Sequence, residues 1–272
     1  MRPVTLTGLC RLAGMSRQAF YRGRRERKRT ARETERILAA VKVERMLQPR
    51  AGARKLQHML RAFDLEVGRD ALFRILAEND LLVEPKKKKV RTTYYDNSLP
   101  VYRNLLYNWE PTQPHQVWVS DVTFIATDEG FTYLSLVTDL ASRRIVGWNA
   151  GDTNSAADCI EALQMAIAQL PRDCWPIHHS DRGSQYCCHE YAAILADRGI
   201  SISMTEQNHC YENCYAERVN GILKDEFNLD GKFRTRAHAR KAIAQAIQTY
   251  NTRRLHTSLK MRTPNQAHQR SA

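Results

Sequence analysis

The stretch Val117-Trp-Val-Ser-Asp-Val-Thr-Phe-Ile125 decides the fold class, because it is an apolar, β-rich run that one carboxylate interrupts. Side chains alternate between the two faces of a strand, so one face carries Asp121 together with Val117, Val119, Thr123 and Ile125. A lone carboxylate among apolar neighbours is costly to bury unless it has a partner. The stretch therefore predicts a central strand that carries a functional aspartate.

Two further β-rich runs follow at residues 131–138 and 143–149. The connections between these three runs are short, so the runs pair as antiparallel neighbours in a meander. The chain then continues with a helix that Ser155 caps, a strand at about 175–180, a helix at 185–198, a strand at 200–204 and a helix at about 212–227. This order predicts an α/β fold, in which a mixed sheet (the three-strand antiparallel meander plus two further strands) is flanked by helices.

Two more carboxylates fall on these later elements. Asp181 comes just after the fourth strand, near the carboxyl end, where sheets of this type usually place their sites. The last helix carries a polar stripe at helical spacing, made of Asn213, Glu217, Asn220 and Lys224. This stripe suits a metal site beside a phosphate backbone, so we expect Asn213, Asn220 and Lys224 to contact DNA. Glu217 alone is better explained by an exposed helix face. Three carboxylates from separate elements, however, are what a pair of Mg²⁺ or Mn²⁺ ions needs for phosphoryl transfer, so we expect two such ions at Asp121, Asp181 and Glu217.

The net charge of +13 is unevenly distributed. Residues 1–100 hold 24 Lys and Arg against 11 Asp and Glu, a balance of +13. Residues 101–223 hold 7 against 15, a balance of −8, and residues 224–272 hold 11 against 3, a balance of +8. Basic flanks favour a polyanion such as nucleic acid, whereas the acidic middle would repel it unless bound cations bridge the two.

Composition excludes several other classes of protein. A hydrophobic content of 43% is typical of a folded chain and not of a disordered one. No apolar run approaches the roughly 20 residues of a membrane span, and the amino terminus lacks the apolar region of a signal peptide. We therefore expect a cytoplasmic protein whose seven cysteines are reduced thiols.

The amino-terminal part reads as helical and DNA-binding. Residues 1–30 predict a helix-turn-helix segment, because Gly14 permits a tight turn and Ser16 can cap the second helix. The expected DNA contacts on that helix are Arg17, Gln18, Arg22, Arg24 and Arg25. A solvated basic face is the alternative explanation for these charges.

The remaining boundaries follow from composition. Residues 31–85 predict a second helical DNA-binding unit, and residues 86–114 a basic linker that begins with Lys86, Lys87, Lys88 and Lys89. The catalytic core is expected over residues 115–228, and a basic carboxyl-terminal helix and tail over residues 229–272. In the tail, Arg253, Arg254 and His256 are expected to contact DNA, although a helix packed on the core would explain the same pattern.

Several collinear motifs carry a family resemblance. They are Trp118-Val-Ser-Asp-Val-Thr123, Asp139-Leu-Ala-Ser-Arg-Arg-Ile-Val-Gly-Trp148, His179-Ser-Asp-Arg-Gly-Ser-Gln-Tyr186, Glu217 followed by Leu223-Lys-Asp-Glu226, and Tyr250-Asn-Thr-Arg-Arg-Leu-His256 with Pro264. Over nearly its whole length the chain resembles OrfB-type insertion-sequence transposases, which are related to retroviral integrases.

The resemblance implies an RNase H-like core in which Asp121, Asp181 and Glu217 form a metal-binding Asp-Asp-Glu triad. It also implies a bacterial, nucleoid-associated enzyme that cleaves element ends and joins the 3′-hydroxyls to target DNA. The implied partners are double-stranded DNA (terminal inverted repeats and target), further copies of the chain in the DNA complex, and an upstream-frame protein or fusion. Two departures from the family pattern, Glu212-Asn213 in place of Asp-Asn and Cys214 in place of a small residue, leave the triad intact.

Three alternatives remain open from the sequence. In the first, the core is inactive and the chain acts only as a DNA-binding protein. In the second, the core is a metal-dependent nuclease that hydrolyses DNA without joining it. A zinc site is the third, with Cys187, Cys188, Cys210 and Cys214 near the histidines at 178, 179, 189 and 209. The cysteine spacing matches no closed zinc-finger pattern, so buried thiols beside the site account for it better.

Overall fold

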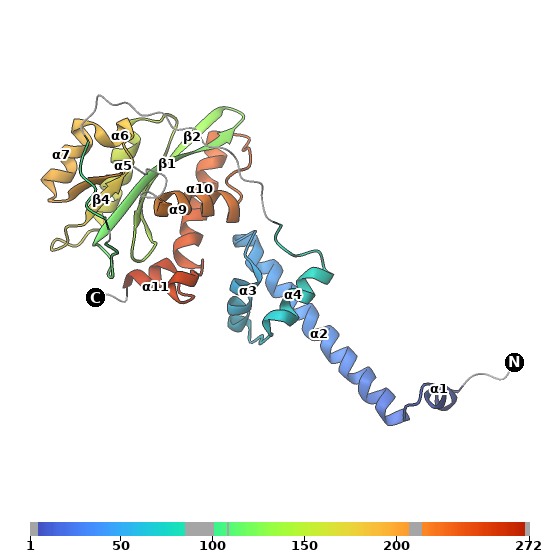
Figure 1. Ribbon diagram of the computed structural model, residues 1–272. Coiled ribbons are helices and arrows are strands. Elements are labelled where there is room, and N and C mark those ends of the chain that lie inside the picture. Colours follow the sequence, from blue (N-terminus) through green and yellow to red (C-terminus); the bar gives the residue numbers. More distant parts are fainter. Residues whose placement is uncertain (1–4, 85–100, 108, 207–213, 270–272) are drawn as a thin grey trace. The chain divides into compact units, whose positions relative to one another are not determined.

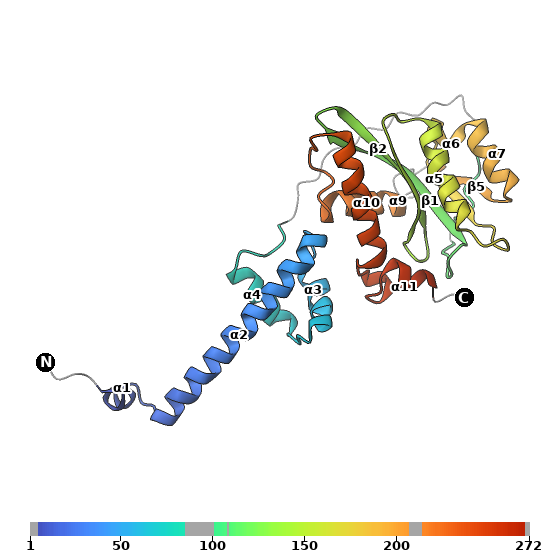
Figure 2. The same cartoon turned by 180° about the vertical axis from the view of Figure 1, so that it is seen from behind.

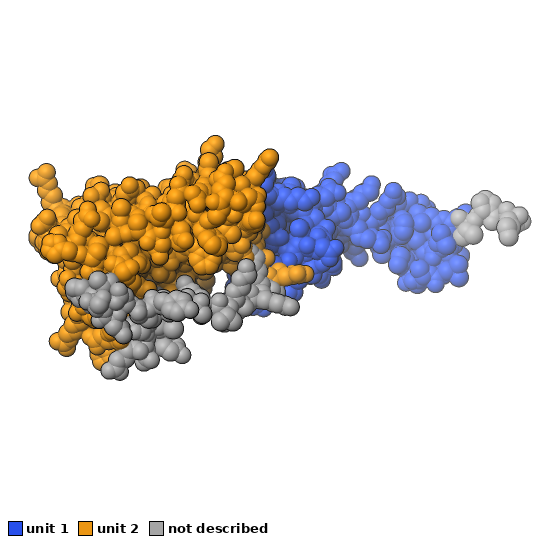
Figure 3. Space-filling model, turned by 90° about the horizontal axis from the view of Figure 1, so that it is seen from above, with its two compact units in different colours: residues 1–46, 51–83 blue, residues 47–50, 84–272 orange. Residues whose placement is uncertain are grey.

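The computed structural model describes residues 5–84, 101–107, 109–206 and 214–269. The chain divides into two compact units, which Figure 3 colours separately: residues 1–46 with 51–83, and residues 47–50 with 84–272. The first unit and the second each contain their own clusters of buried apolar residues.

The first unit is all-helical. Its elements are α1 (Leu6–Leu12), α2 (Arg17–Leu47), α3 (Ala53–Leu60), the 3-10 turn η1 (Arg61–Phe63) and α4 (Arg69–Glu78). Gly14 adopts a positive φ of 64° between α1 and α2, and the Ala19 backbone N–H donates to Ser16 Oγ at 3.1 Å. The predicted turn and helix cap of the helix-turn-helix segment are therefore present.

Helix α2 continues beyond the expected boundary at residue 30. It runs unbroken to Leu47, and its second half buries Ile37, Ala40 and Val41 against α3 and α4. This stretch is rich in Arg, Glu, Ala and Leu, which favour helix and offer no break. The boundary that we expected between two helical units therefore falls inside one helix.

The second unit is built on a five-stranded mixed sheet (Figure 1). Its strands are β1 (Val117–Thr127), β2 (Gly130–Asp139), β3 (Ile145–Gly151), β4 (Ile177–Ser180) and β5 (Ser201–Met204), in the spatial order β3-β2-β1-β4-β5. The first three pair antiparallel, and β4 and β5 add on in parallel beside β1. The predicted mixed sheet is confirmed, with β1 at its centre.

Helices cover both faces of this sheet (Figures 1 and 2). One face buries Trp118 and Val137 against α5 (Ala156–Ala168), α6 (Ser184–Cys187) and α7 (His189–Asp197). The other face buries Ile125 and Leu136 against α9 (Cys214–Glu226) and α10 (Arg236–Thr252). The turn η2 (Thr257–Leu259) and α11 (Pro264–Gln269) follow. Ser155 caps α5 as predicted.

One predicted helix is divided. Residues 185–198 were expected to form a single helix, but Cys188 has an extended backbone with φ −68° and ψ 148° between α6 and α7. Its Sγ donates to the Gln185 carbonyl at 3.4 Å. The break lets Tyr186 and Tyr191 both point into the same buried cluster.

The second unit also extends beyond the expected core of residues 115–228. Before β1, Tyr102 and Leu106 pack on buried clusters of this unit, so the end of the expected linker belongs to the core. After residue 228, Ile243, Ile247 and Tyr250 of α10 are buried against the sheet. These contacts join segments that are distant in sequence, which is why composition alone did not reveal them.

Within the described ranges, each helix is too short or too polar to cross a lipid bilayer.

The close approach of α5 to β3 depends on Gly147. A Cβ at this position would lie 2.0 Å from the Ala162 carbonyl oxygen. We expect Gly147→Ala to lower the free energy of unfolding by about 1–3 kcal/mol, because the helix would have to move. Urea denaturation followed by circular dichroism measures this change.

Gly221→Ala in α9 is the matched control, since a Cβ there meets nothing within 4 Å. Because alanine favours helix, this variant should raise the free energy of unfolding by up to about 1 kcal/mol. An equal loss in both variants would contradict the packing argument.

Candidate active site

Asp121 occupies the middle of β1 and is only 8% exposed. Its Oδ2 accepts a hydrogen bond from Asn220 Nδ2 of α9 at 2.8 Å, and its Oδ1 accepts one from the Val122 backbone N–H at 3.0 Å. These donors offset part of the cost of burying the carboxylate. The predicted partner of the buried aspartate is thus an amide on the facing helix.

Asp181 comes directly after β4, the parallel neighbour of β1. The paired residues Val117 and Ile177, and likewise Val119 and His179, keep a constant offset, and the same offset places Asp181 level with Asp121. Its Oδ1 accepts a hydrogen bond from the Gly183 backbone N–H at 3.0 Å. Asp121 and Asp181 are therefore level when the register of β1 and β4 is continued by two residues beyond their last pair.

Tyr186 is affected by the charges of both Asp121 and Asp181. Its side chain is fully buried, and burial raises its pKa well above the ordinary value, with further contributions from the nearby charges of Asp121 and Asp181. One phenol thus lies within electrostatic reach of both carboxylates. Its hydroxyl stays protonated and neutral beneath the site.

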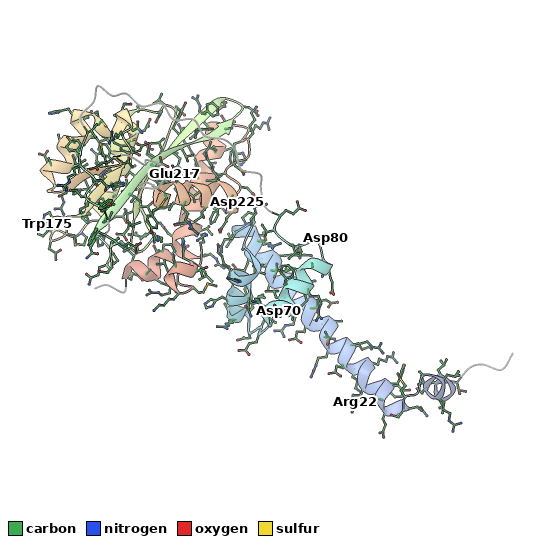
Figure 4. All side chains as sticks on the ribbon, in the orientation of Figure 1. Arg22, Asp70, Asp80, Trp175, Glu217 and Asp225 are labelled. Carbon is green, nitrogen blue, oxygen red and sulfur yellow. The ribbon has the colours of Figure 1, made fainter. Side chains whose placement is uncertain are left out.

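Glu217 lies on α9 where this helix packs against β1 (Figure 4). It is half-buried and precedes Asn220 by one helical turn, so it shares the face of α9 that meets Asp121. Among the described residues, no three His, Cys, Asp or Glu side chains are grouped closely enough to hold a metal ion. The structure therefore brings the three carboxylates to one region from three elements without closing them into a ligand cluster.

A buried polar network lies beneath the aspartates. His178 is 1% exposed, and its Nε2 lies 2.8 Å from Ser120 Oγ and 2.9 Å from Tyr191 Oη. Burial lowers the pKa of His178 to about 3, so the ring is neutral. The network ties β1, β4 and α7 together next to both aspartates. We did not predict this role for His178, because a histidine in a short apolar strand gives no signal that distinguishes a structural role from a ligand.

Similarity to known proteins agrees with this arrangement. Residues 111–210 and 198–264 match two models that are both described as an integrase core domain. The chain is 35% identical over 255 residues to the insertion element IS600 uncharacterized 31 kDa protein of Shigella sonnei, covering 92% of this chain and 94% of that protein. It is 31% identical to transposase InsF for insertion sequence IS3A of Escherichia coli, covering 93% and 90% of the two chains. The chain belongs to the insertion-sequence transposases of the retroviral integrase superfamily.

A solved structure supports the fold of this transposase family member. The simian T-cell lymphotropic virus intasome in complex with a PP2A regulatory subunit superposes with a TM-score of 0.50. It covers 80% of this chain and 71% of the viral chain at 18% identity. The mixed sheet and its flanking helices thus have an integrase-type fold.

The expected DNA contacts of this transposase divide into exposed and buried residues. Arg17, Gln18, Arg22, Arg24 and Arg25 are all exposed on α2, where Figure 4 labels Arg22. Arg253 is exposed after α10. Lys224 is half-buried, with its Nζ 4.5 Å from the centre of the Phe124 ring. Lys86, Lys87, Lys88, Lys89 and Asn213 lie outside the described residues.

Three expected contacts are contradicted by their burial. Asn220 is 2% exposed and holds Asp121, although the polar stripe suggested an outward-facing amide. Arg254 is 6% exposed and forms an ion pair with Glu226 at 2.6 Å, while His256 is 7% exposed and packs its ring on Tyr250. Arg254 and His256 thus pack the carboxyl-terminal segment on the core, whereas Asn220 packs α9 on β1.

The cysteines occupy different environments. Cys187 is buried in the apolar cluster next to Met204, Cys188 is half-buried and Cys214 is exposed at the start of α9. Cys210 and His209 lie outside the described residues. Burial raises the pKa of the Cys187 thiol, with smaller contributions from Asp181 and Cys188.

His178 should make stability depend on pH. The unfolded residue titrates near 6.5, whereas the folded residue stays neutral down to about 3, so the unfolded state binds more protons between these values. Stability therefore falls as the pH falls through this window, by about 1.4 kcal/mol per pH unit at most from one residue. We expect His178→Gln to flatten the dependence between pH 6.5 and 5, measured by urea denaturation.

His189→Gln is the matched control, because His189 is exposed on α7. It should keep the wild-type slope. If His178→Gln also keeps it, the buried imidazole is not the group that titrates.

Proposed function

We propose that this chain is a DNA transposase that cleaves insertion-element ends and joins the 3′-hydroxyls to target DNA, with Asp121, Asp181 and Glu217 as its catalytic carboxylates. The observation that supports this most strongly is that Asp121 lies in β1 and Asp181 directly follows β4, the parallel neighbour of β1, in a chain that matches an integrase core domain. The helix that carries Glu217 is hydrogen-bonded to the first of them.

The donor set fits a hard divalent cation. Carboxylate oxygens are the ligands that Mg²⁺ and Mn²⁺ prefer, and a buried carboxylate beside a second one favours a bound cation over two uncompensated charges. Asp121, Asp181 and Glu217 would hold the ions. When bound, two such ions activate the attacking oxygen and stabilise the leaving oxygen in an in-line displacement at phosphorus.

The side chains around the carboxylates fix their orientation. Asn220 donates to Asp121 Oδ2, and the neighbouring Val122 backbone N–H donates to Oδ1 of the same carboxylate. The Gly183 N–H holds one oxygen of Asp181 in the same way. Preorganised ligands of this kind need little rearrangement at the moment of reaction.

DNA is positioned by basic residues outside the carboxylate site. The exposed arginines of α2, together with Lys224 and Arg253 in the second unit, are suited to phosphate contacts. Contacts of this kind set the register of the duplex and carry no sequence information of their own. They would hold the scissile phosphate against the electrostatic repulsion of the acidic core.

Neutralising any of the three carboxylates should abolish joining. We expect Asp121→Asn, Asp181→Asn and Glu217→Gln each to reduce strand joining by at least about 10³-fold, because each removes a charged ligand of the reaction centre. The assay incubates the full chain with Mg²⁺ and DNA that carries the ends of the parent element, and it scores nicks and joints separately. Nicks without joints in the wild type would identify a nuclease.

Asp197→Asn and Glu190→Gln are the matched controls, since both residues are exposed on α7. They should join DNA like the wild type. Binding of the same DNA, measured without divalent metal, should be unchanged in all five variants. Wild-type joining by any triad variant would overturn the assignment of that residue.

Metal binding should also be visible without catalysis. At an ion concentration ten times the Kd, Mg²⁺ or Mn²⁺ should stabilise the folded chain by about 1.4 kcal/mol, which raises the Tm by roughly 3–6 °C. Differential scanning fluorimetry with and without ions measures this shift. Asp121→Asn should lose most of it and Asp197→Asn should retain it; an equal shift in both would place the ions elsewhere.

A further inference from the structure

A cavity of about 330 Å³ lies beside the candidate active site and shares two of its elements. Val119 of β1 lines it, two residues before Asp121 and on the same face of the strand. Tyr215 of α9 lines it as well, two residues before Glu217. The cavity and the carboxylates are thus held by the same strand and the same helix.

Aromatic side chains dominate the opening of the cavity. Tyr107 is 81% exposed and Trp109 is 41% exposed, although both belong to a segment that packs on the core. Tyr215 forms a third aromatic wall, and Val119 and Leu140 are buried lining residues. Large rings that stay exposed beside an apolar cavity are typical of a surface that binds a flat, apolar-faced ligand.

Polar groups of both kinds converge on the same space. The Arg143 guanidinium lies over the Tyr215 ring, 4.5 Å from its centre. Its Nη1 is buried and has no hydrogen-bond partner within the described part of the chain. Glu110, which also lines the cavity, accepts a weak hydrogen bond from the Tyr215 hydroxyl at 3.4 Å. The cavity therefore offers a cationic donor and a carboxylate acceptor next to its aromatic walls.

The backbone that carries Arg143 is held in place. Arg143 has a positive φ of 62°, which is costly for a side chain with a Cβ. The fully buried Asp139 supports this turn by accepting hydrogen bonds from Ser142 N–H at 2.8 Å, Ser142 Oγ–H at 2.7 Å and His115 N–H at 2.7 Å. The guanidinium is thereby presented to the cavity by a rigid turn.

The aromatic wall is anchored too. The Leu105 N–H donates to Ser203 Oγ of β5 at 2.9 Å, and the Asn104 N–H donates to Glu206 Oε1 at 2.8 Å. The Trp109 N–H donates to the Leu106 carbonyl at 3.1 Å. These hydrogen bonds hold the backbone of the segment that carries Tyr107 and Trp109.

We propose that this cavity binds an unpaired nucleobase of the DNA end on which the carboxylates act. The base would stack on Trp109 or Tyr107, Arg143 would donate to a base carbonyl or to the adjacent phosphate, and Glu110 would accept from an exocyclic amine. This inference rests on the proposed function, because it assigns the ligand class from the neighbouring phosphoryl-transfer site. It gives the protein a means of holding a frayed end in register with the site.

The test compares an unpaired base with its absence. The full chain is titrated, at fixed salt and without divalent metal, into labelled duplexes that end in three unpaired nucleotides or in three abasic nucleotides. We expect the bases to tighten binding by about 5- to 100-fold, because stacking on aromatic side chains has a strength of this order. Trp109→Ala and Tyr107→Ala should each remove most of this difference.

Trp175→Ala is the matched control. Trp175, which Figure 4 labels, is 63% exposed in the same unit and does not line the cavity. This variant should keep the full preference for bases over abasic nucleotides. Photocrosslinking of 5-iodouracil in the unpaired segment should mark Tyr107 or Trp109.

Three results would overturn the inference. They are equal binding of the two duplexes by the wild type, an equal loss of preference in Trp175→Ala and Trp109→Ala, and competition by dAMP as strong as that by the unpaired oligonucleotide, which would indicate a site for free nucleotides. Because metal is absent, the outcome does not depend on the catalytic carboxylates. Loss of joining in Asp121→Asn alongside equal binding of both duplexes would leave the proposed function standing and remove the base site alone.

Discussion

The hydrogen bond from Asn220 to Asp121 joins the helix that carries Glu217 to the strand that carries the first aspartate. The carboxylate of Asp121 is 8% exposed and needs a hydrogen-bond donor, and the buried amide of Asn220 needs an acceptor. The hydrogen bond between them therefore offsets part of the desolvation cost of both groups. The bond fixes the position of α9 along β1. Because Glu217 and Tyr215 lie within the same two turns of α9, it also sets where the third carboxylate and one wall of the aromatic cavity stand.

The buried side chains next to Asp121 and Asp181 are neutral. His178 remains uncharged because burial lowers its pKa to about 3, and Tyr186 remains protonated because burial and two nearby carboxylates raise its pKa. Neither side chain therefore supplies a positive charge to Asp121 or Asp181. The balance of −8 over residues 101–223 agrees with this local picture.

Much of the fold followed from local patterns, and the differences arise where distant contacts decide. The alternation around Asp121, the short turns of the meander and the Ser155 cap are local, and each is confirmed. Asn220 and Arg254 are polar residues on regular helical spacing or near a basic tail, which indicated exposed side chains. Their burial depends on Asp121 and Glu226, 99 and 28 residues away in sequence, and helical periodicity does not encode such partners.

The aromatic cavity was also not predicted from the sequence, because its lining residues are distant from one another in the chain. Tyr107 and Trp109 lie in what composition describes as a linker, Arg143 lies in a short turn, and Tyr215 is an apolar-side residue of α9. The four do not form one sequence motif, because they come from three separate parts of the chain that only the fold brings together. The position of Arg143 depends on Asp139, a fully buried carboxylate that holds the turn of Arg143 and the backbone of His115. Two aspartates in adjacent motifs thus differ in their surroundings: Asp121 accepts from an amide of a facing helix, and Asp139 accepts from three donors of nearby backbone and side chain.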